Sequence, residues 1–254
     1  MKVLVFDVDK SLSSIGGEAD ILKATGGLEP FPIHGGVMQV KTLLSRLYER
    51  KVVEKEHPIF KGDITKVTEY IPTPLCVEMG LDGIVIDTIS TLFVQDKRIL
   101  EHAKGGGADA QLELQDWGKL ERMYSQLMSM INGLPCFKIV TSHAAYDKNQ
   151  ATGAFHYHPD LAGSSKGTIQ RYFDCIFYTK VQTALDKKRV YTWITQPENQ
   201  KFAKDRLGKL KPAIAQDYIP VIQSYQEAGY NDCKILIVGE SGTGKTHSLI
   251  TLNK

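Results

Sequence analysis

Eight consecutive residues near the end of the sequence form a complete phosphate-binding loop, or P-loop, with the pattern GxxxxGK[ST]. Glycines in such a loop let backbone N–H groups converge on phosphate oxygens, and the helix that follows adds a partial positive charge. Lys245 is expected to reach the β- and γ-phosphates of a nucleotide, and the Thr246 hydroxyl to ligate Mg²⁺. The candidate nucleotide-binding residues are Gly239, Glu240, Ser241, Gly242, Thr243, Gly244, Lys245, Thr246 and His247.

The elements that must position this loop are predicted on both sides of it. Residues 234–238 are an apolar run typical of a buried strand, and residues 245–250 are expected to begin a helix. Only eight residues follow Thr246 in the sequence, whereas the strands that complete a nucleotide site normally come after the P-loop. The motif is therefore either inert, or the rest of its site precedes it in a circularly permuted domain.

Composition limits the choice of protein class. With 254 residues, 42% of them hydrophobic, the sequence predicts one α/β domain with a substantial core. The net charge of +2 makes any basic surface a local one, and the four scattered cysteines lack zinc-ligand spacing. Because no signal peptide or long apolar span is recognisable, we expect a soluble cytoplasmic protein without a membrane role.

Further apolar runs predict a mostly parallel sheet. Strands are expected at residues 2–8, 83–86 and 136–141, with two more at 172–178 and 190–195 near one edge. Helices are expected at 37–48, with a charged tail to 56, at 117–131, and around 221–228. Residues 13–35, 93–116 and 144–168 are interpreted as loops. We divide the single domain, 1–254, into a core (1–211), a connector (212–231) and a P-loop unit (232–254).

Moving residues 234–254 in front of Met1 gives the order strand, P-loop, helix, strand. Rejoined in this way, the sequence resembles the RecA/DnaB-like core ATPases, most closely the phage-encoded RecA-core ATPases of single-strand annealing and recombination. Besides the P-loop, the matching segments are VFDVDKSL (5–12), GLDGIVIDTIS (80–90), FKIVTSH (137–143), PDLAGSSKGTIQRYFDCIFY (159–178) and AKDRLGKL (203–210). The resemblance is weakest in 13–75 and 212–231. It implies a circularly permuted RecA-like fold with helices on both sheet faces, using ATP and Mg²⁺.

The resemblance also implies roles for single residues. Asp87 matches the Walker B aspartate that holds Mg²⁺ together with Thr246. Asp9 stands where the family has a glutamate that polarises the attacking water, one methylene shorter. His143 matches the residue that senses the γ-phosphate, although a structural histidine is an equal alternative. Lys204 and Arg206 resemble a finger inserted into a neighbouring subunit's site, the alternative being a solvated charge run.

The implied partners are DNA, more readily single-stranded, and further copies of the chain in a ring or filament. We expect DNA contacts from the loops 93–112 and 144–168, the alternative being ordinary surface loops. The first offers basic residues and the second mixes basic with aromatic residues, a composition suited to base stacking and phosphate contact. These residues are Lys97, Arg98 and Lys104, then Lys148, Phe155, His156, Tyr157, His158 and Lys166. The implied setting is phage recombination, annealing or replication in an infected bacterial cell.

Three other functions compete with a DNA-coupled ATPase. FDVDKSL also resembles the first motif of haloacid-dehalogenase-type phosphatases, with Asp7 as nucleophile, Asp9 as general acid/base and Ser142 as the second-motif hydroxyl. That assignment lacks a downstream acidic pair for Mg²⁺ and leaves the P-loop unexplained. A second alternative is a nucleotide-gated DNA-binding module that does not hydrolyse ATP. In a third, the chain is a fragment whose P-loop opens a further domain.

Overall fold

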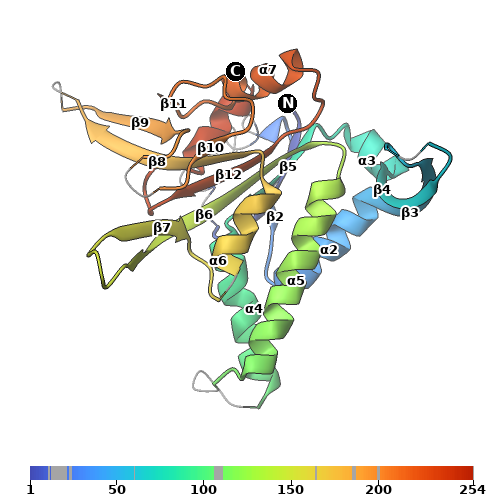
Figure 1. The fold of residues 1–254 in the computed structure, drawn as a ribbon, viewed down its shortest axis with the longest axis horizontal. Coiled ribbons are helices and arrows are strands. Elements are labelled where there is room, and N and C mark those ends of the chain that lie inside the picture. Colours follow the sequence, from blue (N-terminus) through green and yellow to red (C-terminus); the bar gives the residue numbers. More distant parts are fainter. Residues whose placement is uncertain are drawn as a thin grey trace.

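A twisted, mostly parallel sheet runs through the protein in the computed structural model, with helices on both faces (Figure 1). The structure describes residues 1–10, 12, 22, 25–59, 61–105, 111–163, 165–184, 187–198 and 201–253. The predicted α/β class with a mostly parallel sheet is thereby confirmed. Residues 13–21, 23 and 24 of the loop predicted at 13–35 lie outside the described residues. Within the described part of the chain, no helix combines the length and the apolar character needed to cross a membrane.

The centre of the sheet consists of five parallel strands in the order β8-β12-β6-β5-β1. They are β8 (Cys175–Thr183), β12 (Lys234–Gly239), β6 (Phe137–Lys148), β5 (Gly83–Asp87) and β1 (Val3–Asp7). The short β2 (Phe31–Pro32) extends the sheet beyond β1. At the other edge, β9 (Arg189–Ile194) and β11 (Ala213–Ala215) run antiparallel, and β10 (Lys204–Asp205) also pairs with β8.

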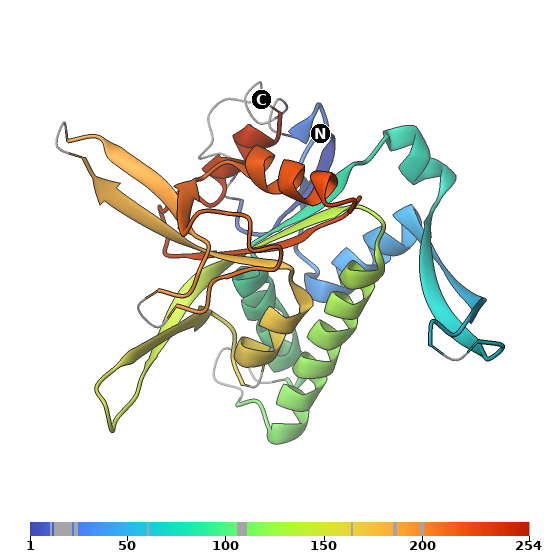
Figure 2. The ribbon, with the colours of Figure 1, turned by 45° about the horizontal axis from the view of Figure 1, so that its top comes forward.

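The P-loop strand β12 therefore lies in the middle of the sheet, paired along its length with β6 and β8. We expected β1, which leads to Asp9, to be its immediate neighbour, and this is wrong because β5 and β6 lie between them. Both intervening strands carry apolar side chains on both faces, as a central position requires. The ammonium of Met1 donates a hydrogen bond to the Leu252 carbonyl at 3.3 Å. The two ends of the described chain thus lie side by side (Figures 1 and 2).

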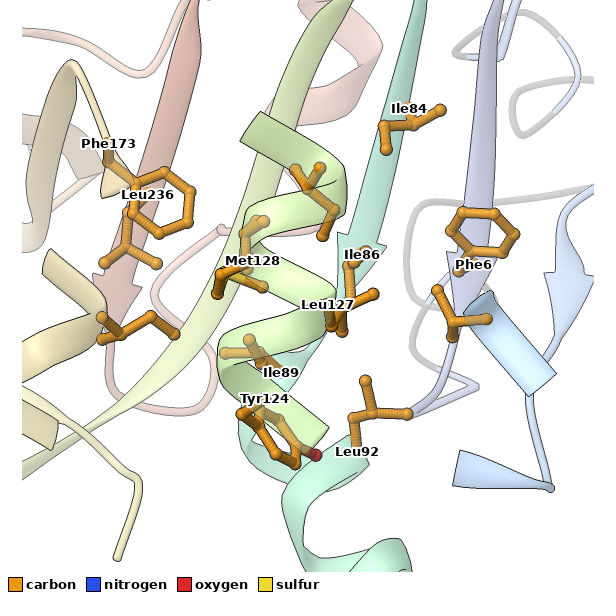
Figure 3. Packing of buried hydrophobic residues seen from close by; sticks show 14 of the residues in the cluster. Phe6, Ile84, Ile86, Ile89, Leu92, Tyr124, Leu127, Met128, Phe173 and Leu236 are labelled. Atoms are coloured by element: carbon orange, nitrogen blue, oxygen red, sulfur yellow. The ribbon is translucent and has the colours of Figure 1, made fainter. Parts of the chain in front are cut away.

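Helices α2 (Gly36–Leu47), α4 (Ile89–Ala103) and α5 (Leu114–Gly133) cover one face of the sheet. Alternate strand residues such as Phe6, Ile84 and Ile86 point to this side and pack against α5 residues including Leu127 (Figure 3). Helix α5 begins three residues before the predicted start because Glu113 and Asp116 form a reciprocal cap at its first turn.

The other face is covered by α7 (Tyr218–Glu227) and the 3-10 helix η3 (His247–Asn253). Here the opposite strand residues, such as Val85 and Ile237, form a second core with Tyr218 and Val221. We expected an α-helix after the P-loop. The Ser248 and Thr251 hydroxyls instead donate to carbonyls three residues back, at 2.5 and 2.8 Å, which matches the i→i+3 repeat of a 3-10 helix.

Several segments predicted as loops are regular elements. Residues 93–103 belong to α4, because Ile89, Leu92, Phe93 and Asp96 recur at helical spacing on its buried side. The charged tail after α2 is β3 (Tyr48–Glu56), which forms a hairpin with β4 (Ile64–Pro72). Both strands are largely exposed, and their apolar residues do not alternate with polar ones, so the two-residue period that identifies a strand is absent from the sequence. The short α3 (Pro74–Met79) leads from β4 to β5.

The predicted loop 144–168 contains a second hairpin, formed by the far half of β6 and β7 (Phe155–Pro159). Two short helices follow, α6 (Ser165–Thr168) and η2 (Ile169–Tyr172). The β6–β7 and β8–β9 hairpins project from the same end of the molecule, opposite the β3–β4 hairpin (Figures 1 and 2). Hairpins therefore extend from both ends of the molecule.

Candidate functional site

A cavity of about 540 Å³ lies at the carboxyl ends of the central parallel strands. This is the edge at which open α/β sheets bind their ligands. The P-loop forms one wall of the cavity, and residues that follow β1, β5 and the buried part of β6 form the other. The lining residues are Asp9, Thr88, His143, Tyr191, Ser241, Gly242, Gly244, Lys245, Thr246 and His247.

The P-loop has a defined shape. Gly242 and Gly244 adopt positive φ values of 74° and 85°, which a side chain would strain. Two side chains from the β8–β11 side of the sheet hold the loop at Thr243: Thr179 Oγ1 donates to the Thr243 hydroxyl at 2.7 Å, and Gln216 Nε2 donates to its carbonyl at 3.0 Å. The curve of backbone amides is thus fixed by neighbouring strands.

The Lys245 side chain lies inside the curve of the loop. Its Nζ donates to the carbonyls of Gly239 and Glu240, both at 2.8 Å, and only 6% of the residue is exposed. Burial lowers the pKa of this ammonium, while the nearby charges of Asp87, Asp9 and Glu240 act in the opposite direction. The Lys245 ammonium is therefore held at the floor of the cavity, close to these three acidic groups.

Thr246 and Asp87 are joined directly. The Thr246 hydroxyl donates to Asp87 Oδ2 at 2.7 Å, and the Thr141 hydroxyl on β6 donates to Oδ1 of the same carboxylate. Asp87 is fully buried at the end of β5. A carboxylate and a hydroxyl oxygen side by side are ligands suited to Mg²⁺, which usually takes one or two protein oxygens and completes its shell with phosphate and water.

Asp9 and His143 form the opposite wall. His143 Nε2 donates to Asp9 Oδ2 at 3.2 Å, and the Thr88 hydroxyl donates to the same oxygen at 3.3 Å. Burial raises the pKa of Asp9, but the hydrogen bonds of His143, Thr91 and Thr88 and the charge of His143 outweigh it and lower the pKa overall. The Asp9 carboxylate is therefore ionised at neutral pH and held facing the P-loop.

Lys204 and Arg206 lie away from this cavity. Lys204 Nζ donates to the Phe173 carbonyl and Arg206 Nη1 to Asp174 Oδ1, both at 2.7 Å. Asp174 also accepts from the backbone N–H of Lys234, the first residue of β12, at 3.2 Å. Both basic side chains are thus bonded within their own chain at the end of β12 opposite the P-loop, although 62% of the Arg206 side chain is exposed.

The two segments expected to contact DNA differ in structure. Lys97 and Arg98 lie on α4, and Lys104, which ends that helix, pairs with Asp116 at 2.5 Å. Part of the 93–112 segment, including most of its glycine triplet, lies outside the described residues.

The β6–β7 hairpin presents an aromatic face. The Tyr146 ring lies 5.2 Å from the ring of Phe155 and 6.1 Å from that of Tyr157. Lys148 and Lys201 lie over Phe155 and Tyr157, at 5.9 and 5.1 Å from the ring centroids. Away from these rings, Asp147 pairs with His158 and with Lys166, and His156 is exposed.

The phosphatase alternative places its residues differently. Ser142 Oγ is buried and lies 2.9 Å from the Ser90 hydroxyl, inside the sheet–helix interface. Among the described residues, Asp9 lines the cavity but Asp7, which ends β1 beside Asp87, does not. The geometry therefore brings only one of the three residues of that hypothesis to the cavity.

Four residues at the site were not anticipated. Thr141 and Thr88 anchor the two acids, Gln216 holds the P-loop, and Tyr191 lines the cavity from β9. The threonines lie within two residues of His143 and Asp87, so their position beside predicted strand ends could have identified them as site residues. Tyr191 lies on β9, next to the edge of the sheet, and Gln216 directly follows the edge strand β11; nothing in the sequence distinguishes either from neighbouring residues.

Comparison with known protein families gives one result. A family model described as an AAA domain matches residues 1–207, more than half of the chain. The matched region contains Asp9, Asp87 and His143 but ends before the P-loop. No significant match was found among curated proteins or among solved structures.

Proposed function

The chain belongs to the AAA domain family, and we propose that it binds and hydrolyses ATP in the cavity beside the P-loop. The observation that carries the proposal is the 2.7 Å hydrogen bond between Thr246 and Asp87. It joins the P-loop to an acid at the end of another central strand, the pairing that phosphoryl transfer requires for charge neutralisation. A chance P-loop in a surface turn would have no reason to contact a fully buried aspartate.

In this proposal the backbone amides of the P-loop and Lys245 bind the phosphates. Thr246 and Asp87 would hold Mg²⁺, which supplies neutralisation of phosphate charge when bound. Asp9 is ionised and faces the same cavity, so it can orient a water molecule and accept its proton. His143 holds Asp9 in place and lines the same cavity, where it would sense a γ-phosphate.

We further propose that the domain is a circular permutation of a RecA-like core, with 1–254 acting as one unit. The order β8-β12-β6-β5-β1 supports this, because β12 occupies the central place although it follows the other four strands in sequence. Met1 and Leu252 are in hydrogen-bond contact, so the P-loop unit (232–254) can precede β1 without rearranging the sheet.

Coupling to single-stranded DNA is the third element of the proposal. The aromatic face of the β6–β7 hairpin, with Lys148 and Lys201 over its rings, has the chemistry for stacking bases and contacting phosphates. Strand β6 carries both His143 and Tyr146, three residues or about 10 Å apart, so one rigid element links the cavity to the hairpin. A ring or filament acting in phage recombination, annealing or replication is the setting that the resemblance suggests.

Steady-state hydrolysis measurements test the proposal. The purified chain is expected to release phosphate from ATP with Mg²⁺, faster with single-stranded DNA, and Lys245→Ala is expected to abolish this. Lys180→Ala removes a partly exposed lysine on β8 as the matched control and should leave the rate unchanged. Phosphatase activity that survives Lys245→Ala would instead favour the Asp7/Asp9 hypothesis.

A non-hydrolysing, nucleotide-gated module is the second candidate, favoured by the shorter carboxylate at Asp9 than the family's glutamate. Binding of an ATP analogue without any turnover, together with nucleotide-dependent DNA binding, would support that candidate over an ATPase.

A further inference from the structure

A second cavity, of about 430 Å³, adjoins the P-loop cavity. The two share Tyr191 and His247, so they form one continuous depression along the P-loop. Besides these two residues, the second cavity is lined chiefly by Arg189 and Gln216 and, from η3, by Ile250 and Thr251. Apart from His247, none of the candidate nucleotide-binding residues lines the second cavity.

The second cavity lies on the β9 side of the P-loop strand, whereas the first extends from that side to the ends of β5 and β1. Asp87, which contacts Thr246, ends β5 on one side of β12, and Tyr191 belongs to β9 on the other. In a P-loop the lysine reaches the β- and γ-phosphates and the Ser/Thr hydroxyl binds the metal. The γ-phosphate end of a bound nucleotide therefore faces Asp87 and Asp9, and the α-phosphate and nucleoside must extend toward Tyr191.

Tyr191 is fixed at the entrance to this second cavity. A Cβ placed on Gly244 would lie 3.1 Å from Cδ1 of the tyrosine, so the ring packs directly against the P-loop. Gln216 strengthens this arrangement because its Nε2 donates to the carbonyl of Thr192 at 3.3 Å and to that of Thr243 at 3.0 Å. The strand that carries the ring and the loop that binds phosphate are thus tied together before any ligand enters.

We propose that this second cavity binds the nucleoside of the nucleotide, with the flat heteroaromatic base stacked on Tyr191. The inference rests on the proposed function, since it requires the phosphates to lie in the P-loop. The half-buried phenol ring and the Ile250 side chain supply an apolar surface, and the exposed guanidinium of Arg189 can donate hydrogen bonds to a ribose.

Comparing two ligands tests the assignment: the non-hydrolysable ATP analogue AMP-PNP and inorganic tripolyphosphate, which has the phosphates but no nucleoside. Affinities are measured by calorimetry on the full chain with Mg²⁺. The wild-type protein is expected to bind AMP-PNP at least tenfold more tightly than tripolyphosphate. Tyr191→Ala should weaken AMP-PNP about tenfold and leave tripolyphosphate within about twofold, whereas Tyr191→Phe should resemble wild type.

Tyr230→Ala is the matched control, because it removes an exposed tyrosine near the start of β12, and it should change neither affinity. Equal wild-type affinities for the two ligands would overturn the inference without any variant, as would equal weakening of both by Tyr191→Ala. If Tyr191→Ala does not fold, Tyr191→Leu keeps an apolar side chain and should still reduce only the affinity for AMP-PNP. Failure of the wild-type protein to bind either ligand would refute the proposed function itself, and this inference with it.

Discussion

The hydroxyl of Thr246 is hydrogen-bonded to the carboxylate of Asp87, although 159 positions separate the two residues in sequence. The contact crosses the sheet from the P-loop to the end of β5, past β6, whose Thr141 binds the other carboxylate oxygen. Residues on β5, on β6 and after β12 therefore hold one buried acid beside the P-loop, where we propose that Mg²⁺ binds.

Asp87→Asn is expected to reduce Mg²⁺-dependent hydrolysis about 100-fold, because the variant loses the charge that attracts the metal but keeps the shape of the side chain. Thr246→Ala should cause a comparable loss, and the double variant should be little worse than either single one, since both residues act through the same ion. Rates measured across a Mg²⁺ titration provide the check. Fully additive losses would contradict a shared role.

Asp9→Asn is expected to slow hydrolysis by a factor of about 100 or more while leaving the affinity for an ATP analogue unchanged. The pKa of Asp9 is lowered from its ordinary value of 3.8, so the carboxylate is ionised at any pH above that value. This group should therefore cause no change in rate between pH 5 and 8. A loss of rate from Asp9 is expected only at lower pH, as the carboxylate becomes protonated. Single-turnover rates against pH test this, and a titration in Asp9→Asn that matches wild type would contradict it.

Arg206 should be tested for action in a neighbouring subunit. If it is a trans-acting finger, Arg206→Ala and Lys245→Ala should each be inactive alone, and a mixture of the two should recover hydrolysis because some interfaces combine an intact P-loop with an intact arginine. Asp174→Asn provides the control, since it releases the arginine from its 2.7 Å intrachain bond without removing it. Full activity of Arg206→Ala would leave this arginine only a structural role at the start of β12.

Asp96 is predicted to make stability depend on pH. It is buried on α4, where it accepts from the Val37 amide at 3.1 and 3.2 Å and from the Tyr124 hydroxyl at 3.0 Å. Burial raises its pKa to about 6 despite these hydrogen bonds. Since the folded-state pKa lies above the unfolded value near 4, the folded state favours the protonated acid.

The contribution of Asp96 to stability is therefore fully present below about pH 4 and is lost as the pH rises through about 6. Relative to the neutral variant Asp96→Asn, the wild-type free energy of unfolding should fall by about 2 kcal/mol between pH 4 and pH 7. Urea denaturation of both proteins across this range measures the difference. Parallel pH profiles would show that Asp96 does not titrate as inferred.

The aromatic face of the β6–β7 hairpin is predicted to bind single-stranded DNA. Tyr146→Ala and Phe155→Ala should each weaken binding about tenfold, because each removes a stacking surface, and should leave ATP affinity unchanged. Tyr230→Ala, which removes an exposed tyrosine near the start of β12, is the control. Fluorescence anisotropy with labelled oligonucleotides measures the effect, and equal binding by all variants would place DNA elsewhere or exclude it.

Local sequence patterns were sufficient for the buried half of this fold. Strands β1, β5 and β12 and helix α5 follow from apolar runs or a clear helical period, and the P-loop follows from its spacing. The convergence of Asp9, Asp87 and His143 was expected because all three lie at or just after the carboxyl ends of parallel strands. Their functional roles stay predictions until the variants are measured.

Solvent-facing and non-local features were not predictable in the same way. The β3–β4 hairpin is largely exposed and shows no regular apolar alternation, so pairing between residues such as Val53 and Val67 defines it rather than any local period. The position of β1 relative to β12 depends on which strands occupy the centre of the sheet, and that order is determined by tertiary packing rather than by local sequence. Tyr191 and Gln216 reach the site because β9 and β11 pair antiparallel near the edge of the sheet, and that pairing cannot be predicted from sequence spacing.

The position of β12 has a consequence for how the protein is made. Strands β6 and β8 are synthesised before it but do not pair with each other, so each exposes an open edge until residues 234–239 leave the ribosome. The middle of the sheet is thus its last part to be completed, through contacts distant in sequence, which favours slow folding and an aggregation-prone intermediate. The predicted phosphate-binding residues are then in the same segment that closes the sheet, so the candidate nucleotide site can form only after β12 has paired with β6 and β8.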